Sequence, residues 1–446
     1  MSVARRLIAF FAVILVLQLS GAAPAQRGFS IIRDSEIEQT IRFMSTPIFR
    51  AASFDPDRIN LIIVNDRRLN AFVAGGMNMF LHTGLLMEAE NPEELLGVVA
   101  HETGHIAGGH LVRGSESLAR SGMTAAAATI LGVIAAAASG NPEAGMAVIQ
   151  GGQEIARRSF LANSRSIENQ ADQAALTFLD EAEISSEGLL SFFNKLQAQE
   201  LLPPSQQDEY IRTHPLTQDR IRAIRAHVKT SEHTDDALPP EYYERFDRMR
   251  AKLIGYLRPP KETLRRFAPD DPAIDSRYAR AVAYFRGGQV EESLAVFDGL
   301  IEEEPENPFF WEMKGQVLFE NGRVDEAIKH YRRAVELEPE AGLIRIGLAH
   351  ALIATNDEDA LPSAVEHLHA AQQTERATPM LHRWLGIAYG RMGQRAMAEL
   401  HLAEEALLQG RRKDAQRKAR IALAGLEEGS PQWFQAQDIL AMLQTL

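Results

Sequence analysis

The chain has 446 residues, of which 45% are hydrophobic and 24% are charged, and it contains no cysteine. This length exceeds one ordinary core, so we expect more than one domain, and the composition excludes disordered and fibrous classes. Its 47 basic and 60 acidic residues give a formal net charge of −13. That charge opposes binding to phosphate backbones and excludes nucleic acid as an expected partner.

The N-terminal segment has the pattern of a secretory signal. Two arginines precede an apolar run over residues 7–19, and Ala23-Pro24-Ala25 forms a small-x-small cleavage site. The apolar run is short for a membrane span, although an uncleaved anchor is the alternative. We therefore expect residues 1–25 to be removed near Ala25. An exported chain without cysteine fits a bacterial periplasm better than a disulfide-rich extracellular fold.

Residues 26–230 mix short strands with helices and form the first predicted domain. Ile59 to Val64 predicts a buried strand, and the alternation from Met77 to Leu81 predicts another. The second strand is a candidate edge strand for holding an extended substrate; an interior strand of the core is the alternative. Asn91-Pro92-Glu93-Glu94 then combines an N-cap, a first-turn proline and a glutamate, which predicts the start of a helix.

An alanine-rich segment without charge follows at residues 122–139. Alanine contributes little to bilayer transfer, so a buried or surface-covering helix is favoured over a membrane span. Peripheral membrane contact through residues 122–150 stays open, although the segment has no basic face to support it.

The second half of the chain contains an internal repeat. Residues 231–272 are rich in proline and charge and predict a helical linker. Residues 288–306 align with residues 322–340 at an offset of 34, with seven of 19 positions identical. A period of 34 with helix–turn–helix patterning is typical of the tetratricopeptide repeat. We therefore expect a helical solenoid over residues 273–446.

The stretch VVAHETGHIAGGH, residues 98–110, places two histidines on one face of the predicted helix. His101 and His105 are four residues apart and can bind one metal ion together, and Glu102 can reach a water on that metal. A catalytic zinc takes three protein ligands and leaves one position open. His110 would point away from the site if the helix continued. The alternative is a pair of ordinary surface histidines.

A second helical pair supplies carboxylates. Glu168 and Asp172 are also four residues apart and are flanked by alanines, which places both acids on the buried side of a helix. Buried acids need a partner. Glu168 on zinc and Asp172 on the other N–H of a ligand histidine would satisfy both; an exposed helix with its acids in water is the alternative.

Three motifs together resemble the gluzincin metallopeptidases, which include the CAAX prenyl endopeptidases and the bacterial heat-shock membrane protease. The resemblance is carried by His101-Glu102-x-x-His105, by Ser164-Arg165-x-x-Glu168-x-x-Ala171-Asp172, and by Thr213-His214-Pro215 with Arg220.

The resemblance implies one Zn²⁺ per chain, held by His101, His105 and Glu168. Glu102 would be catalytic, and Asp172 would assist or donate a proton. His214 would either cap the zinc in a latent state or stabilise the transition state. The implied fold is mainly α: an α+β catalytic domain with a small sheet and a zincin active-site helix, followed by the repeat solenoid.

With a signal peptide and repeats, the chain is most similar to periplasmic members of this family. The resemblance implies an endopeptidase that degrades misfolded or stalled outer-membrane proteins and also assists their assembly as a chaperone. Its repeats would contact the outer-membrane β-barrel assembly machinery. The alternative from another class is a non-catalytic or latent chaperone or adaptor that binds such clients through its repeats.

Overall fold

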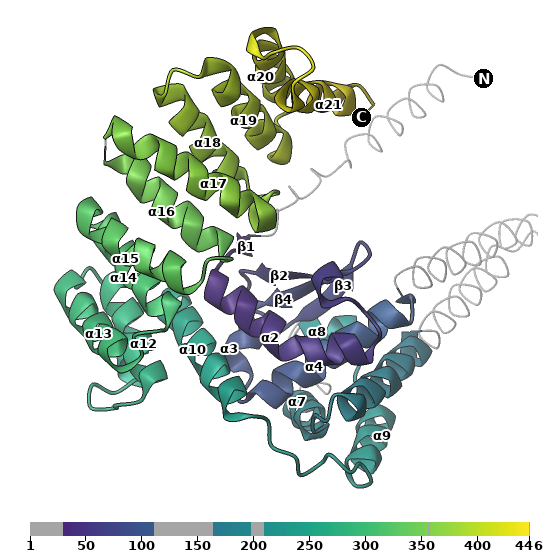
Figure 1. The fold of residues 1–446 in the computed structure, drawn as a ribbon. Helices are drawn as coiled ribbons and strands as arrows, with labels where there is room; N and C mark the ends of the chain where they lie inside the picture. The colour runs from purple at the N-terminus through teal and green to yellow at the C-terminus, as the bar shows by residue number, and fades with distance from the viewer. Residues whose placement is uncertain (1–29, 111–163, 198–208, 356, 446) are drawn as a thin grey trace, which may run out of the picture.

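The computed structural model describes residues 30–110, 164–197, 209–355 and 357–445. The predicted signal segment, residues 1–25, and the alanine-rich segment, residues 122–150, both lie outside these ranges. Within the described part, no helix has the length and apolar character that a membrane crossing requires. The described chain is mainly helical with one small sheet, which confirms the predicted fold class (Figure 1).

The sheet has four short strands in the order β1-β2-β4-β3. Their bounds are β1 Ile31–Ile32, β2 Asn60–Val64, β3 Ala71–Ala74 and β4 Asn78–His82. Strands β2 and β4 are parallel, whereas β1 and β3 are antiparallel to their neighbours. The predicted strand at Ile59 to Val64 corresponds to β2. The predicted strand at Met77 to Leu81 corresponds to β4, which is interior, so its interpretation as an edge strand is wrong.

Helices enclose this sheet and form the first hydrophobic core. They are α2 Ser35–Ala51, α3 Thr83–Glu88, α4 Pro92–Ala107, a helix over 164–181, α7 Glu187–Gln197, α8 Glu209–Thr213, α9 Gln218–Val228 and α10 Pro240–Leu257, with a 3-10 turn η1 Pro56–Arg58. Helices α2 and α4 pack on each other, α2 against β2 and α4 against β3. Phe246 and Met249 of α10 belong to the same core.

The rest of the described chain is a series of antiparallel helix pairs that curves around the sheet-containing unit (Figure 1). A short helix α11 Pro260–Arg266 leads into the pairs. Their bounds are α12 Ile274–Arg286 and α13 Val290–Glu303, α14 Pro308–Glu320 and α15 Val324–Leu337, α16 Gly342–Ala354 and α17 Leu361–Glu375 with the 3-10 turn η2 Glu358–Ala360, α18 Pro379–Arg391 and α19 Arg395–Leu408, and α20 Arg412–Gly425 and α21 Pro431–Thr445. Of these helices, α16 and α17 lie close to β1 and α2 (Figure 1).

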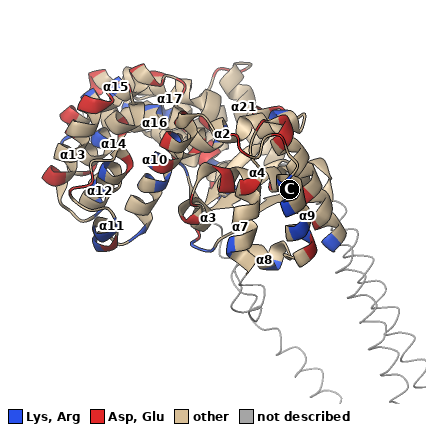
Figure 2. Ribbon diagram, turned by 90° about the horizontal axis from the view of Figure 1, so that it is seen from below, with Lys and Arg blue, Asp and Glu red and all other residues tan. Residues whose placement is uncertain are grey.

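Each of the first two pairs turns on a glycine at the same place in the repeat. Gly288 has φ +78° and Gly322 has φ +79°, and they are 34 residues apart. This left-handed conformation favours glycine, because other residues place their Cβ too close to the backbone. Figure 2 shows acidic and basic segments side by side along these helices rather than a surface of one sign.

Buried charges connect the sheet-containing unit to the repeats. Lys252 of α10 is 1% exposed, and its Nζ lies 2.8 Å from Oδ2 of Asp34 and 3.3 Å from Oε2 of Glu36. Tyr278 of α12 donates a hydrogen bond of 2.7 Å to Glu36. Helix α10 therefore packs against both units and supplies the cation that both surround.

Candidate metal centre

Helix α4 begins at the predicted position. The Asn91 side chain accepts a hydrogen bond of 2.9 Å from the backbone N–H of Glu94, and Pro92 occupies the first turn. The helix passes through the centre of the first core, so His101 and Glu102 are fully buried and His105 is 7% exposed. Buried polar groups at these positions need partners from other elements.

Those partners come from the helix over residues 164–181, which approaches α4 very closely. A Cβ on Gly104 would lie only 2.6 Å from the backbone oxygen of Ala171. The two helices can be this close only because residue 104 has no side chain. The contact brings Glu168 and Asp172, which are 3% and 2% exposed, to the histidines of α4.

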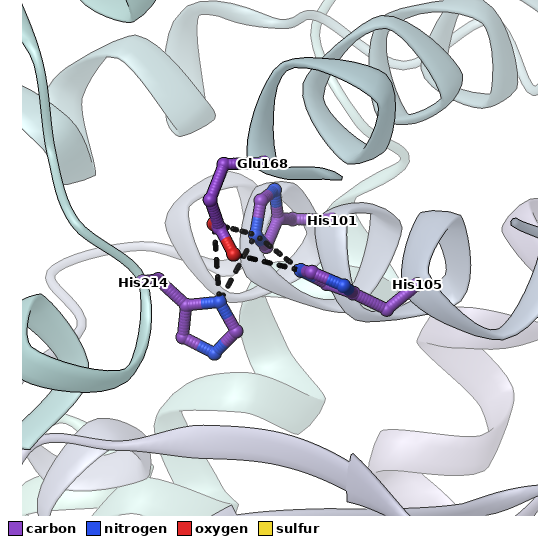
Figure 3. Close-up of side chains that lie close together, drawn as sticks. All are labelled: His101, His105, Glu168 and His214. Carbon is purple, nitrogen blue, oxygen red and sulfur yellow. Dashed lines mark hydrogen bonds and ion pairs between the residues drawn. The ribbon is translucent and has the colours of Figure 1, made fainter. Parts of the chain in front are cut away.

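Four side chains converge on one point (Figure 3). The Nε2 atoms of His101 and His105 are 3.1 Å apart, and Glu168 Oε2 lies 3.4 Å from His101 Nε2. His214 Nδ1 lies 3.2 Å from Glu168 Oε2 and 3.4 Å from His101 Nε2. A tetrahedral zinc ion with bonds of 2.0–2.1 Å separates its ligand atoms by roughly 3.3 Å. The spacing of these four atoms matches such an ion.

The outer nitrogen of each histidine faces an acceptor. His101 Nδ1 lies 2.9 Å from Asp172 Oδ1. His105 Nδ1 lies 3.1 Å from His110 Nδ1. His214 Nε2 lies 3.3 Å from the backbone oxygen of Ala71. A proton on each outer nitrogen leaves the inner lone pair directed at the common point, which is the usual arrangement of metal-ligating histidines.

The charges at this point also require a cation. Glu102, Glu168 and Asp172 are all buried. Arg220, which is 1% exposed, lies 2.6 Å from Asp172 Oδ2 and 3.1 Å from Glu168 Oε2. One guanidinium compensates one of three carboxylates, so a divalent cation would neutralise the remainder. The donor set and charge therefore fit a zinc ion.

Without a cation, His101 is driven to take up a proton, whereas burial and the neighbouring His101 and His214 lower the pKa of His105. Burial lowers the pKa of His101, but hydrogen bonding to Asp172 and Glu168 outweighs it and raises that pKa to about 9. Burial would raise the pKa of Glu168, yet the nearby His214 and His101 hold it well below its usual range. The raised pKa of His101 and the lowered pKa of Glu168 have one cause: the buried carboxylates are stabilised by positive charge between these side chains.

Glu102 lies beside the four-atom cluster rather than in it. Within the described ranges, neither of its carboxylate oxygens accepts a hydrogen bond, and Oε1 lies 3.4 Å from His214 Nε2. Burial raises the pKa of Glu102. A buried carboxylate without hydrogen-bond donors is suited to accept a proton from a water molecule at the cluster.

The structure differs from the sequence expectation at His110. Helix α4 ends at Ala107, and Gly109 adopts φ +59°, so the chain turns back. A Cβ on Gly108 would meet the His110 ring at 2.2 Å, so the ring lies directly over this glycine. His110 is therefore not a member of the four-residue cluster, but it contacts the outer nitrogen of His105. The expectation that it points away from the site is wrong because the helix does not continue.

Two further groups at the site were not predicted from sequence. The Tyr210 ring lies 4.7 Å from the His214 ring, and its hydroxyl is buried. Tyr210 precedes His214 by four residues, a spacing that could have suggested a shared face. Ala71 of β3 contacts His214 through its backbone oxygen alone, and no side-chain pattern carries such information.

Comparison with known families agrees with this geometry. The model of peptidase family M48 matches residues 32–228, which include all the clustered side chains. A tetratricopeptide repeat model matches residues 278–342 and 312–368.

Three curated relatives are similar to this chain over 63%, 76% and 93% of its length. A protein named putative beta-barrel assembly-enhancing protease from Vibrio cholerae is 27% identical over 286 residues, which cover 63% of this chain and 58% of that protein. The beta-barrel assembly-enhancing protease of Escherichia coli K12 is 24% identical over 76% of this chain and 68% of its own length. The Yersinia pestis protein of the same name is 23% identical over 93% of this chain and 84% of its own. The first part of the chain is therefore similar to family M48 metallopeptidases, and the helix pairs that follow are similar to tetratricopeptide repeats.

Proposed function

We propose that this chain is a periplasmic, zinc-dependent endopeptidase that cleaves misfolded or stalled outer-membrane β-barrel proteins. The observation that carries the peptidase assignment is the convergence of His101, His105, Glu168 and His214 beside the buried carboxylate of Glu102, which accepts no hydrogen bond from the described residues. The names of the relatives support the client class, and the predicted N-terminal signal supports the compartment.

Each residue then has a separate task. His101, His105 and Glu168 would hold one zinc ion, which would acidify a bound water and polarise the substrate carbonyl. Glu102 takes a proton from the attacking water and passes it to the leaving amine. Asp172 Oδ1 lies 2.9 Å from the outer nitrogen of His101, and Arg220 binds Asp172 in turn. These contacts favour an assisting role for Asp172 over proton donation, because both of its oxygens already face hydrogen-bond donors.

Strand β3 is the edge that we propose for the substrate. The backbone N–H of His82 donates to the oxygen of Asn70, so the groups of Asn70 face β4. Because an antiparallel strand alternates, the groups of Ala71 and Val73 face outward. In the described part of the chain, no further strand pairs with this edge. An extended peptide could add to it through main-chain hydrogen bonds without a strict sequence requirement.

In this structure, the segment that contains α8 and His214 already contacts part of the outward edge of β3. The backbone N–H of Tyr210 lies 3.2 Å from the oxygen of Leu69, and His214 Nε2 faces the oxygen of Ala71. His214 also supplies the fourth atom of the cluster. The arrangement supports a latent state, in which α8 and His214 must move before water and substrate can enter. Of the two alternatives raised by the sequence, a latent enzyme and a non-catalytic adaptor, the arrangement favours the latent enzyme.

Substitution of the proposed base tests the peptidase assignment. In Glu102→Gln, we expect casein cleavage to fall by roughly 10²–10⁴-fold, the usual contribution of a positioned acid–base group, while zinc content stays at one per chain by elemental analysis. The matched control is Glu181→Gln, at an exposed position on the 164–181 helix. Persistent cleavage by Glu102→Gln would remove Glu102 from the mechanism.

The client class has its own test. Purified chain should cleave a urea-unfolded porin after dilution, and should spare the same porin folded in detergent. Equal cleavage of unfolded porin and unfolded casein would argue for a general peptidase without this specialisation.

Removal of the fourth side chain tests latency. In His214→Ala, three ligands remain, so zinc should be retained, and casein cleavage should rise several-fold because the open position no longer has a protein ligand. His227→Ala, a histidine of α9 paired with Asp180, is the control. A fall in cleavage would instead assign His214 to stabilisation of the transition state.

A further inference from the structure

A second group of potential metal ligands lies away from the catalytic cluster. Asp66 follows β2, His82 ends β4, and Glu209 begins α8, and one potential ligand atom from each lies within 4.8 Å of the others. None of the three belongs to the cluster around His101. The group joins the sheet to the segment that carries His214.

The histidine of this group is the feature that requires explanation. His82 is 1% exposed, and in the described residues neither of its ring nitrogens has a hydrogen-bond partner. A buried polar group without a partner costs about 1–3 kcal/mol. The imidazole therefore has a lone pair available toward the two carboxylates, and a bound cation would satisfy it.

The surrounding backbone holds Asp66 in place beside the residues that follow His82. The backbone oxygen of Asp66 accepts hydrogen bonds from Thr83 Oγ1 and from the backbone N–H of Gly84, at 2.9 and 2.8 Å. Asp66 Oδ1 accepts a further bond of 2.9 Å from the backbone N–H of Arg68. A Cβ on Gly84 would lie 2.3 Å from the oxygen of Arg67, so this junction is closely packed.

In this structure, Arg68 supplies the positive charge. Its guanidinium lies 2.5 Å from Asp66 Oδ2 and 2.7 Å from Glu209 Oε2. The Arg68 side chain is 56% exposed, so it can leave for solvent with little loss of packing. One monovalent guanidinium leaves one negative charge between two carboxylates, whereas a divalent cation neutralises both. A metal would also bind the lone pair of His82, to which the guanidinium of Arg68 makes no hydrogen bond among the described residues.

We propose that Asp66, His82 and Glu209 form a second, exchangeable site for a zinc-like divalent cation, which binds in competition with Arg68. One imidazole and two carboxylates suit zinc, cobalt or manganese rather than calcium, which takes oxygen ligands only. Resting on the proposed function, a cation here would fix Glu209 and hence α8 against the loop after β2. It would thereby keep His214 at the catalytic cluster and make excess zinc an inhibitor.

Zinc stoichiometry tests the site without reference to activity. Purified chain dialysed against excess zinc should hold two ions, and Asp66→Asn or Glu209→Gln should hold one. The ion at the catalytic cluster reports in every variant that the first domain has folded. In Arg68→Ala, which removes the competitor and no ligand, the second zinc should bind at least tenfold more tightly. Arg222→Ala, which breaks an exposed pair with Asp219 on α9, should leave both affinities unchanged.

Two results would overturn the site. One is a single zinc in both wild type and Arg68→Ala, which would leave Arg68 as a plain ion pair. The other is a second zinc retained by both ligand variants, which would place it elsewhere.

Casein cleavage separates the site from its effect on α8. Excess zinc should slow the wild type several-fold and should affect Glu209→Gln much less. Equal inhibition of the two proteins would refute the coupling to His214. A chain that never cleaves casein would refute the proposed function, while the stoichiometry would still decide whether the second site exists.

Discussion

The described part of the chain contains two buried histidine clusters, and they differ in the groups that surround the imidazole rings. In the repeats, His382 Nδ1 lies 3.4 Å from His401 Nδ1, and the His401 ring stacks on Tyr389 at 5.6 Å. In the peptidase domain, three imidazoles meet the carboxylate of Glu168. Both clusters are buried and both lie between packed helices, so burial alone does not distinguish them.

The difference lies in what surrounds the rings. In the repeats, Glu405 is the buried acid on the helix of His401, and Arg383 binds its carboxylate at 2.7 Å. Among the described residues, the repeat histidines form no group with metal-ligand spacing. In the peptidase domain, outer acceptors fix each ring so that the lone pairs converge. A histidine cluster therefore becomes a metal centre through its carboxylate and its outer acceptors, and otherwise it is core packing.

The largest expected effect is a loss of zinc binding when a histidine of the peptidase cluster, rather than of the repeat cluster, is replaced. His105→Gln removes a ligand, and we expect zinc affinity to fall by at least about 100-fold, beyond the range seen for outer-shell changes. His401→Gln should leave the zinc content and casein cleavage unchanged. Elemental analysis after dialysis measures both variants. Equal zinc loss in the two would mean that the repeat cluster contributes to metal binding.

Substitution of two glycines compares how closely the helices pack in the two regions. In Gly104→Ala, the new methyl group meets a backbone oxygen of the neighbouring helix at 2.6 Å, whereas in Gly386→Ala it meets the flexible side chain of Leu402 at 2.7 Å. Overpacking typically costs 1–3 kcal/mol. We expect about 3 kcal/mol for Gly104→Ala, with weakened zinc binding, and less than about 1 kcal/mol for Gly386→Ala. Chemical denaturation measures both; a reversed order would contradict the helix contact described here.

The smallest expected effect is a loss of stability of the repeats as the pH falls. Burial, with His382 and His369 nearby, lowers the pKa of His401 to about 3. The folded state then binds fewer protons than the unfolded state between about pH 3 and 6.5, so the stabilisation is complete above pH 6.5 and declines as the pH falls. The expected loss is about 1.4 kcal/mol per pH unit. Hydrogen exchange of α18 and α19 between pH 7.5 and 5.5 measures it, and His401→Leu should flatten the response.

Local signals predicted much of this molecule. The N-cap at Asn91 located the start of α4, and the 34-residue period identified the repeats. The i, i+4 spacings singled out two pairs, His101 with His105 and Glu168 with Asp172, that lie together in the structure. Features that depend on contacts between residues far apart in the sequence, or on where the backbone turns, could not be predicted from the sequence. Strand β4 is interior because β3 returns beside it, His110 turns back because Gly109 ends the helix, and the contact of His214 with β3 involves backbone atoms that no residue pattern encodes.

The ammonium of Lys252 has a practical consequence for dissecting the protein. It is sealed between Asp34 and Glu36 of one unit and lies 4.0 Å from Glu312 of the repeats. A truncated peptidase that ends before α10 would retain Asp34 and Glu36 without the ammonium of Lys252. One that ends directly after α10 would expose these three charged side chains to solvent. We therefore expect that an independently folding fragment does not end at the start of the repeats. Attempts to transplant the catalytic unit should carry α10 together with the first two helix pairs, since Glu312 lies in α14.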